Sequence, residues 1–129
     1  MPDIEIGIAG LQEAQDRNNR RIANLRPTGV VGRAIRDATA DLHRYAISIT
    51  HVDTGSLRAS HRMAVSGAAG RIYLDPAAVN PRTGERPAVY GIEEEERGGS
   101  HAFYTRTREE RGPYALARAK DEIRRGLYL

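Results

Sequence analysis

Residues 31–49 read VGRAIRDATADLHRYAISI and carry a regular apolar pattern. The pattern advances in alternating steps of four and three residues, which aligns its members along one face of a helix, as at the a and d positions of a coiled coil. Its members are Val31, Ile35, Ala38, Leu42, Tyr45 and Ile49. A helix of about twenty residues is about 30 Å long. With Thr28 as its N-cap, this stretch predicts a long helix that forms the spine of a small domain.

The residues before this helix predict a short strand followed by a first helix. Ile4, Ile6 and Ile8 alternate with acidic or small residues, which is the period of a strand that ends at Gly10. A second apolar stripe then advances by three or four residues until Pro27, which ends the helix. The members of this stripe are Leu11, Ala14, Asn18, Ile22 and Leu25.

After the long helix, short runs separated by turn residues predict an antiparallel sheet of about four strands within residues 61–108. The runs are 63–65, 72–74, 89–92 and 101–108. Residues 75–87 hold three prolines and predict a loop, because proline fits neither a helix interior nor a central strand. The polar tip of this loop, residues 80–86, is the segment that we expect to be mobile or to contact a partner.

The last part of the chain predicts a helix over residues 113–126. Pro113 suits the first helical position, and the expected apolar stripe is Leu116, Ala119, Ile123 and Leu127. Strands that are grouped between helices indicate an α+β domain. We therefore expect one domain over residues 1–129, with a strand and two helices in residues 4–50, the sheet, and the C-terminal helix.

The composition argues against several classes of protein. The chain has 129 residues, the size of one domain, and no cysteine, which removes disulfides, thiolate catalysis and Cys-ligated zinc. No run approaches the roughly 18 apolar residues of a membrane span, and the acidic N-terminus lacks the apolar run of a signal peptide. We expect a soluble protein with no membrane partner.

The net charge of +3 does not come from a basic face. Residues 1–64 hold nine basic and seven acidic residues, and residues 65–129 hold eleven and ten. Such interleaving does not favour specific nucleic-acid recognition. All the basic residues except Lys120 are arginines. Arginine suits two-point pairing with carboxylates at interfaces, although genome composition or a hot habitat produces the same bias.

The sequence contains no strong catalytic motif. Asp53-Thr54-Gly55 is the triplet of aspartic proteases, in which two aspartates share a proton, but those enzymes place it at the end of a strand, whereas here it follows a long helix. The chain has no phosphate-binding glycine loop, and its histidines lack a metal-ligand spacing. They are His43, His51, His61 and His101. We expect no enzymatic activity, no cofactor and no metal site.

Four consecutive glutamates, residues 93–96, suggest an interface. Like charges in a row repel one another, so they require solvent or nearby arginines of the same chain or of a neighbouring copy. The alternative is an exposed strand end. The candidate interface residues are Arg82, Arg86, Glu93, Glu94, Glu95, Glu96, Arg106 and Arg108.

The segment after the long helix, VDTGSLRAS at residues 52–60, is the most distinctive part of the chain. Here Asp53 or Thr54 can accept hydrogen bonds from backbone N–H groups, Gly55 can adopt positive φ, and Leu57 can anchor the turn in the core. We expect this segment to fix the long helix against the sheet. The residues of this hinge motif are Asp53, Thr54, Gly55, Leu57 and Ser60.

With Tyr90, Glu93 and the PYALARA start of the last helix, the hinge motif resembles the small tail-component proteins of long-tailed bacteriophages. These are called tail-completion, neck or head-tail joining proteins. The likeness covers about residues 4–127, and the chain departs from the usual pattern in its four glutamates and in the run at 101–108.

The resemblance implies a structural virion protein without catalytic residues. It implies a ring, with six copies as the expected number, that joins the tail to the head connector. Its partners would be copies of itself and other neck and tail proteins, and it would be located in the virion, and in the host cytoplasm during assembly. A tail terminator or a connector stopper is the alternative within this class. A retroviral-type aspartic protease and a nucleic-acid-binding protein are the distant alternatives.

Overall fold

The computed structural model describes residues 2–26, 28–51, 55–66 and 69–127. It has the α+β class predicted from the sequence, with a long N-terminal helix, an antiparallel hairpin and a C-terminal helix. The elements in chain order are α1 (Pro2–Leu25), α2 (Val30–Ile49), α3 (Ser56–Ala59), β1 (His61–Ser66), β2 (Ala69–Leu74), α4 (Pro87–Arg97), η1 (Gly99–His101), α5 (Phe103–Arg106), η2 (Thr107–Arg111) and α6 (Gly112–Leu127).

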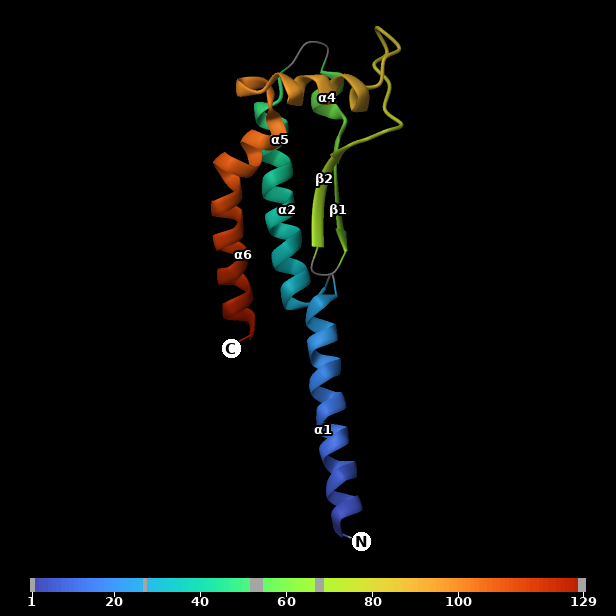
Figure 1. The fold of residues 1–129 in the computed structure, drawn as a ribbon, viewed down its shortest axis with the longest axis vertical. Coiled ribbons are helices and arrows are strands. Elements are labelled where there is room, and N and C mark those ends of the chain that lie inside the picture. Colours follow the sequence, from blue (N-terminus) through green and yellow to red (C-terminus); the bar gives the residue numbers. More distant parts are fainter. Residues whose placement is uncertain (1, 27, 52–54, 67–68, 128–129) are drawn as a thin grey trace.

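Helix α2 is the predicted spine and lies at the centre of the fold, between α6 on one side and the β1–β2 hairpin on the other (Figure 1). Glycines allow both neighbours to approach it closely. A Cβ atom at Gly70 of β2 would lie 1.9 Å from Thr39 Oγ1, and one at Gly126 of α6 would lie 2.4 Å from Val30 Cγ1. The helix begins after Gly29, so the prediction of Thr28 as its N-cap is wrong.

The hairpin confirms two of the predicted strands. Strands β1 and β2 are antiparallel, with His61 opposite Leu74 and Met63 opposite Ile72. Because Gly70 meets α2, the alternation of a strand turns Met63 and Ile72 to the same side. The opposite face carries Arg71, whose guanidinium lies 4.5 Å from the centroid of the Tyr73 ring.

The predicted strands at 89–92 and 101–108 are wrong, because both segments are helical. Helix α4 contains the first, and the second lies in η1, α5 and the π-helical turn η2. Pro87 occupies the first turn of α4, where its missing N–H costs nothing, and the glutamates that follow are good helix formers. In the described part of the chain, the sheet therefore contains two strands instead of about four.

The strand predicted for Ile4, Ile6 and Ile8 is also wrong, because these residues belong to α1. A strand requires a neighbour for its backbone hydrogen bonds, whereas a helix satisfies them within itself. Ile4, Ile8 and Leu11 also fit helical steps of four and three. Asp3 and Glu5 fall in the first turn of α1, where negative charge suits the helix dipole.

The apolar stripe predicted for the C-terminal helix is only partly correct. Ala119 is buried as expected, and Ala115 is buried beside it. Leu116 and Leu127, however, are 56% and 48% exposed. Since α6 crosses α2 at close range, its small residues form the contact and the larger ones point outward.

The two ends of the molecule differ in shape. At one end, α4 lies across the hairpin, and at the other α1 projects away from the remaining elements as a single helix (Figure 1). We call α1 the arm and residues 28–127 the body. Among the described residues, no helix combines the length and apolarity that a membrane crossing requires.

Residues 75–86 form the predicted loop between β2 and α4. Its tip is closed around Asn80, which is buried. The Asn80 N–H donates to Glu85 O over 2.8 Å, and Asn80 Oδ1 accepts from the Arg82 N–H over 2.9 Å. The charged side chains of the tip therefore stand on a turn with its own hydrogen bonds.

Candidate functional site

The hinge motif forms a tight turn into α3. Gly55 has a φ of 86°, the left-handed conformation that was predicted for this glycine. Its carbonyl accepts a hydrogen bond from the Ala59 N–H over 2.9 Å. Asp53 and Thr54 lie outside the described residues, so the capping role expected of them stays a prediction.

Leu57 and Ser60 tie this turn to the body. Leu57 is buried and lies against α4, where a Cβ atom at Gly91 would come within 3.1 Å of Leu57 Cδ1. Ser60 is 1% exposed, and its hydroxyl donates to Leu57 O over 2.8 Å. The Ser60 carbonyl accepts from the Asp75 N–H at the end of β2. The turn thus connects α4 with the base of the hairpin.

A buried polar network lies beside the turn. Thr50 donates to Ala46 O, so its oxygen accepts from His61 Nε2–H over 2.8 Å, and Tyr104 donates to His61 Nδ1 over 2.8 Å. Both ring nitrogens are thereby satisfied in the neutral imidazole. Burial, aided by the charges of His43 and Arg62, lowers the pKa of His61 to about 4. Burial and, to a smaller degree, Glu95 raise the pKa of Tyr104.

Two of the candidate interface glutamates have partners within the chain. Glu95 caps α5, since its carboxylate accepts from the Tyr104 and Thr105 N–H groups over 2.9 and 2.8 Å. Glu94 pairs with Arg97 over 3.1 Å. A carboxylate at a helix N-terminus is stabilised by unpaired N–H groups and by the helix dipole. These two glutamates therefore serve the fold of the body.

Arg106, another of the candidate interface residues, also has its partner within the chain. Arg106 pairs with Glu110, one helical turn ahead, and it also donates to Ser100 O. The hydrogen bond with Arg106 and a second one from Tyr45 lower the pKa of Glu110. The remaining candidate interface residues are exposed, and they are Arg82, Arg86, Glu93, Glu96 and Arg108.

A shallow depression brings some of these exposed residues together. Glu85 and Arg86 of the loop line it together with Val89, Tyr90 and Glu93 of α4, around a volume of about 340 Å³. The exposed candidate interface residues therefore do not form one surface. Arg86 and Glu93 line the depression between the loop and α4, whereas Arg108 lies elsewhere, on η2.

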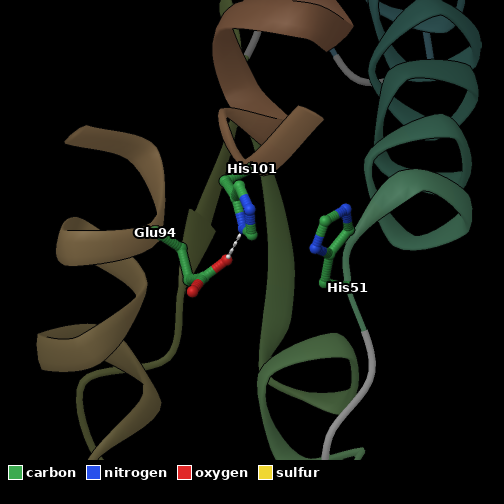
Figure 2. Close-up of side chains that lie close together, drawn as sticks. All are labelled: His51, Glu94 and His101. Atoms are coloured by element: carbon green, nitrogen blue, oxygen red, sulfur yellow. Dashed lines mark hydrogen bonds and ion pairs between the residues drawn. The ribbon is translucent and has the colours of Figure 1, made fainter. Parts of the chain in front are cut away.

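A cluster of two histidines and a glutamate forms where α2, α4 and η1 meet (Figure 2). His51 lies two residues after the end of α2, Glu94 lies on α4 and His101 ends η1. His101 Nδ1 lies 2.8 Å from Glu94 Oε2, and the ring centroids of His51 and His101 are 4.4 Å apart. One potential ligand atom from each side chain lies within 4.8 Å of the others. We call these three residues the His–Glu cluster.

The arm presents exposed apolar side chains along its described part. Leu11, Ile22 and Leu25 are 60%, 45% and 44% exposed. They belong to the stripe that the sequence predicts for the first helix, and residues 11–23 are exposed on every side of the helix in the described part of the chain.

Comparison with known protein families, with curated proteins and with solved structures finds no match to this chain.

Proposed function

We propose that this chain is a structural, non-enzymatic subunit of the neck of a long-tailed bacteriophage, in the tail-completion position, and that its copies assemble into a ring. The exposed apolar stripe of the arm carries this proposal. A helix of 24 residues is about 36 Å long, and its apolar face gains free energy only when another surface covers it. The resemblance of the hinge motif to phage tail components supports the same conclusion.

The occupant of the arm's stripe is a second copy of the chain. Residues 1–16 hold four acidic residues and no lysine or arginine, whereas residues 17–129 hold twenty basic residues against thirteen acidic ones. The distal half of the arm is therefore negative, and the rest of the molecule is positive. Such a distribution favours docking of the arm on a neighbouring subunit.

Docking of an arm on the body of the next copy makes a head-to-tail contact. Contacts of this kind use two different patches on each subunit and close into rings when the rotation allows. The body offers exposed apolar side chains for such a patch, among them Leu116 and Leu127 on α6. A ring of this type suits a neck protein, which must surround the axis of the tail.

The mass of the full chain in solution tests the self-association step. We expect an oligomer at low ionic strength, as measured by light scattering or native mass spectrometry, and smaller species at about 1 M salt, because the Debye length falls to about 3 Å. A chain that stays monomeric at high concentration and low salt would exclude a second copy as the occupant.

A matched pair of variants tests the role of the stripe. Leu11→Gln with Ile22→Gln places polar groups on the stripe and should shift the protein to the monomer. Arg20→Gln with Ala23→Gln introduces the same residue twice at exposed positions away from the stripe, and should leave the oligomer intact. Equal loss in both variants would mean that the stripe is not the contact.

Counting copies in particles tests the placement in the virion. Quantitative mass spectrometry of gradient-purified particles from a culture that produces this chain should give a small fixed number, about six or twelve copies, relative to the tail-tube subunit. Absence from the particle would contradict the neck assignment and leave an assembly chaperone or one of the distant alternatives.

A further inference from the structure

We propose that the His–Glu cluster binds a divalent transition-metal ion, with Zn²⁺ as the best fit, through His51, Glu94 and His101, and that the fourth coordination position remains open. This site is separate from the assembly surface of the arm. It reverses the expectation from the sequence that the chain has no metal site.

The types of donor in the cluster select the ion. Two imidazole nitrogens and one carboxylate oxygen match the three protein ligands found in open zinc sites. Magnesium and calcium prefer oxygen ligands alone, whereas imidazole suits zinc, copper and nickel. Closed zinc sites have four protein ligands, whereas open sites have three and bind water at the fourth position. The cluster offers three ligands and therefore fits the open type.

The geometry requires only a small adjustment. Ligands that surround Zn²⁺ tetrahedrally at about 2.1 Å lie about 3.4 Å apart, and the potential ligand atoms here already lie within 4.8 Å of one another. His51 is exposed, so its ring can turn toward the other two without disturbing the core. His101 Nδ1 and Glu94 Oε2 already face each other in a hydrogen bond. An ion bound between these two atoms would replace the proton that they share.

The neighbours of the cluster orient one of its ligands. Arg97 lies 3.1 Å from Glu94 Oε1, which leaves Oε2 for the ion. Such an outer partner fixes the orientation of a ligand carboxylate. The side chain of Glu94 is only 20% exposed, so the site is sheltered on the side of α4 and open on the side of His51.

A bound ion would join three separate elements. His51 follows the last turn of the spine α2, Glu94 lies on α4, and His101 lies on the turn that leads into α5. The chain has no cysteine with which to cross-link these segments. Because an ion that binds the folded chain and not the unfolded one stabilises the fold, zinc would strengthen the end of the body that carries the hinge motif.

Zinc titration of the metal-free full chain tests the proposal. We expect one Zn²⁺ per chain by calorimetry, and a rise in melting temperature of roughly 5–10 °C when zinc exceeds its dissociation constant about 100-fold. Co²⁺ should produce the visible absorption of a four-coordinate site with nitrogen and oxygen ligands. Absence of binding, or a bound ion without any effect on the melting temperature, would overturn the proposal.

Matched variants identify the ligands. His51→Ala and Glu94→Gln should each weaken zinc binding at least about tenfold, since even partners that only orient a ligand contribute about 10- to 100-fold. Glu93→Gln changes the same residue type one position earlier on α4, at an exposed site outside the cluster, and should bind zinc like the unaltered chain. Because His51 is exposed, its variant keeps the fold and is informative even where Glu94→Gln is destabilised. Unaltered binding by His51→Ala, or equal losses in the two glutamate variants, would overturn the proposal.

Discussion

Helices α1 and α2 follow one another in the chain and have similar lengths, yet their surroundings are opposite. Both carry an apolar stripe with helical spacing. The chain surrounds α2 with α6 and the hairpin, whereas α1 stands alone and its leucines remain about half exposed. Apolar spacing shows that a face of a helix requires cover, but it does not show whether the same chain or another one supplies that cover. The following predictions test this contrast between body and arm.

The largest expected difference comes from the same substitution in the two regions. Leu57→Ala in the body removes a side chain that is 7% exposed and should lower the free energy of unfolding by about 2–5 kcal/mol. Leu11→Ala in the arm removes one that is 60% exposed and should change it by no more than about 0.5 kcal/mol. Urea unfolding of both variants at high salt, under conditions in which the chain is monomeric, measures the difference. Similar losses would show that the arm packs on its own body.

Acid should weaken the body through His61. The pKa of His61 is about 4 in the folded state and about 6.5 in an unfolded chain, so the unfolded state binds the proton more readily between these values. Stability from this residue is fully present above pH 6.5 and is lost as the pH falls toward 4, by about 3 kcal/mol in total.

Unfolding curves measured between pH 7 and pH 4 test this prediction, with His61→Gln as the control. The variant should show a flatter pH dependence, although it is less stable at neutral pH. All four histidines lie in the body, so the arm has no group of this kind. An unchanged pH slope in the variant would assign the acid sensitivity to other residues.

Substitution of Gly55 should lower the stability of the fold by a smaller amount. Gly55→Val places a β-branched residue at a φ of 86°, and strain in this region costs about 1–3 kcal/mol. A Cβ atom at this position meets no atom within 4 Å among the described residues, so the loss reports backbone strain alone. Gly55→Asn should be milder, because asparagine tolerates the left-handed region. Thermal unfolding compares the two, and a Val variant as stable as the Asn variant would contradict the role of the turn.

The smallest difference in stability is expected between variants of two aspartates, one in the body and one in the arm. Asp41 of α2 accepts two hydrogen bonds from Arg111, both over 2.9 Å, and this pair lowers the pKa of Asp41. Asp41→Asn should cost about 1–2 kcal/mol. Asp16 of the arm accepts an exposed hydrogen bond from Gln12, so Asp16→Asn should change stability by less than about 0.5 kcal/mol. Chemical unfolding at neutral pH measures the stability of both variants. Equal losses in the two would contradict the expected difference between the body and the arm.

The signals for the helices were stronger in the sequence than those for the strands. The seam of α2 extends over five helical steps, whereas the runs at 89–92 and 101–108 hold only a few apolar residues. Short apolar runs fit a strand and a buried helix equally well. Pro87 and the glutamates that follow it were the local indication that α4 is a helix.

The candidate site was less accessible to sequence reasoning than the fold. His51 and His101 are fifty positions apart, and Glu94 is seven positions from His101. No motif with a fixed spacing describes such a set, because packing of α4 and η1 against the end of α2 brings the three side chains together. The role of Glu95 as the cap of α5 has the same origin, since its partners lie nine and ten residues ahead on another helix.

By itself, the sequence determined the length of α2, the hairpin, the loop at 75–86, the positive φ of Gly55 and the existence of a C-terminal helix. These features depend on interactions between residues that are close along the chain, such as helical spacing and turn conformation. The sequence did not determine the buried face of α2, because the buried residues of this helix are Gly32, Ala34, Thr39, Asp41 and Ala46, whereas the predicted stripe is half-buried. The tertiary structure alone decided which faces are covered, how the glutamates are paired and which histidines meet. These features depend on contacts between distant segments, and close packing at residues such as Gly70 and Gly126 sets them.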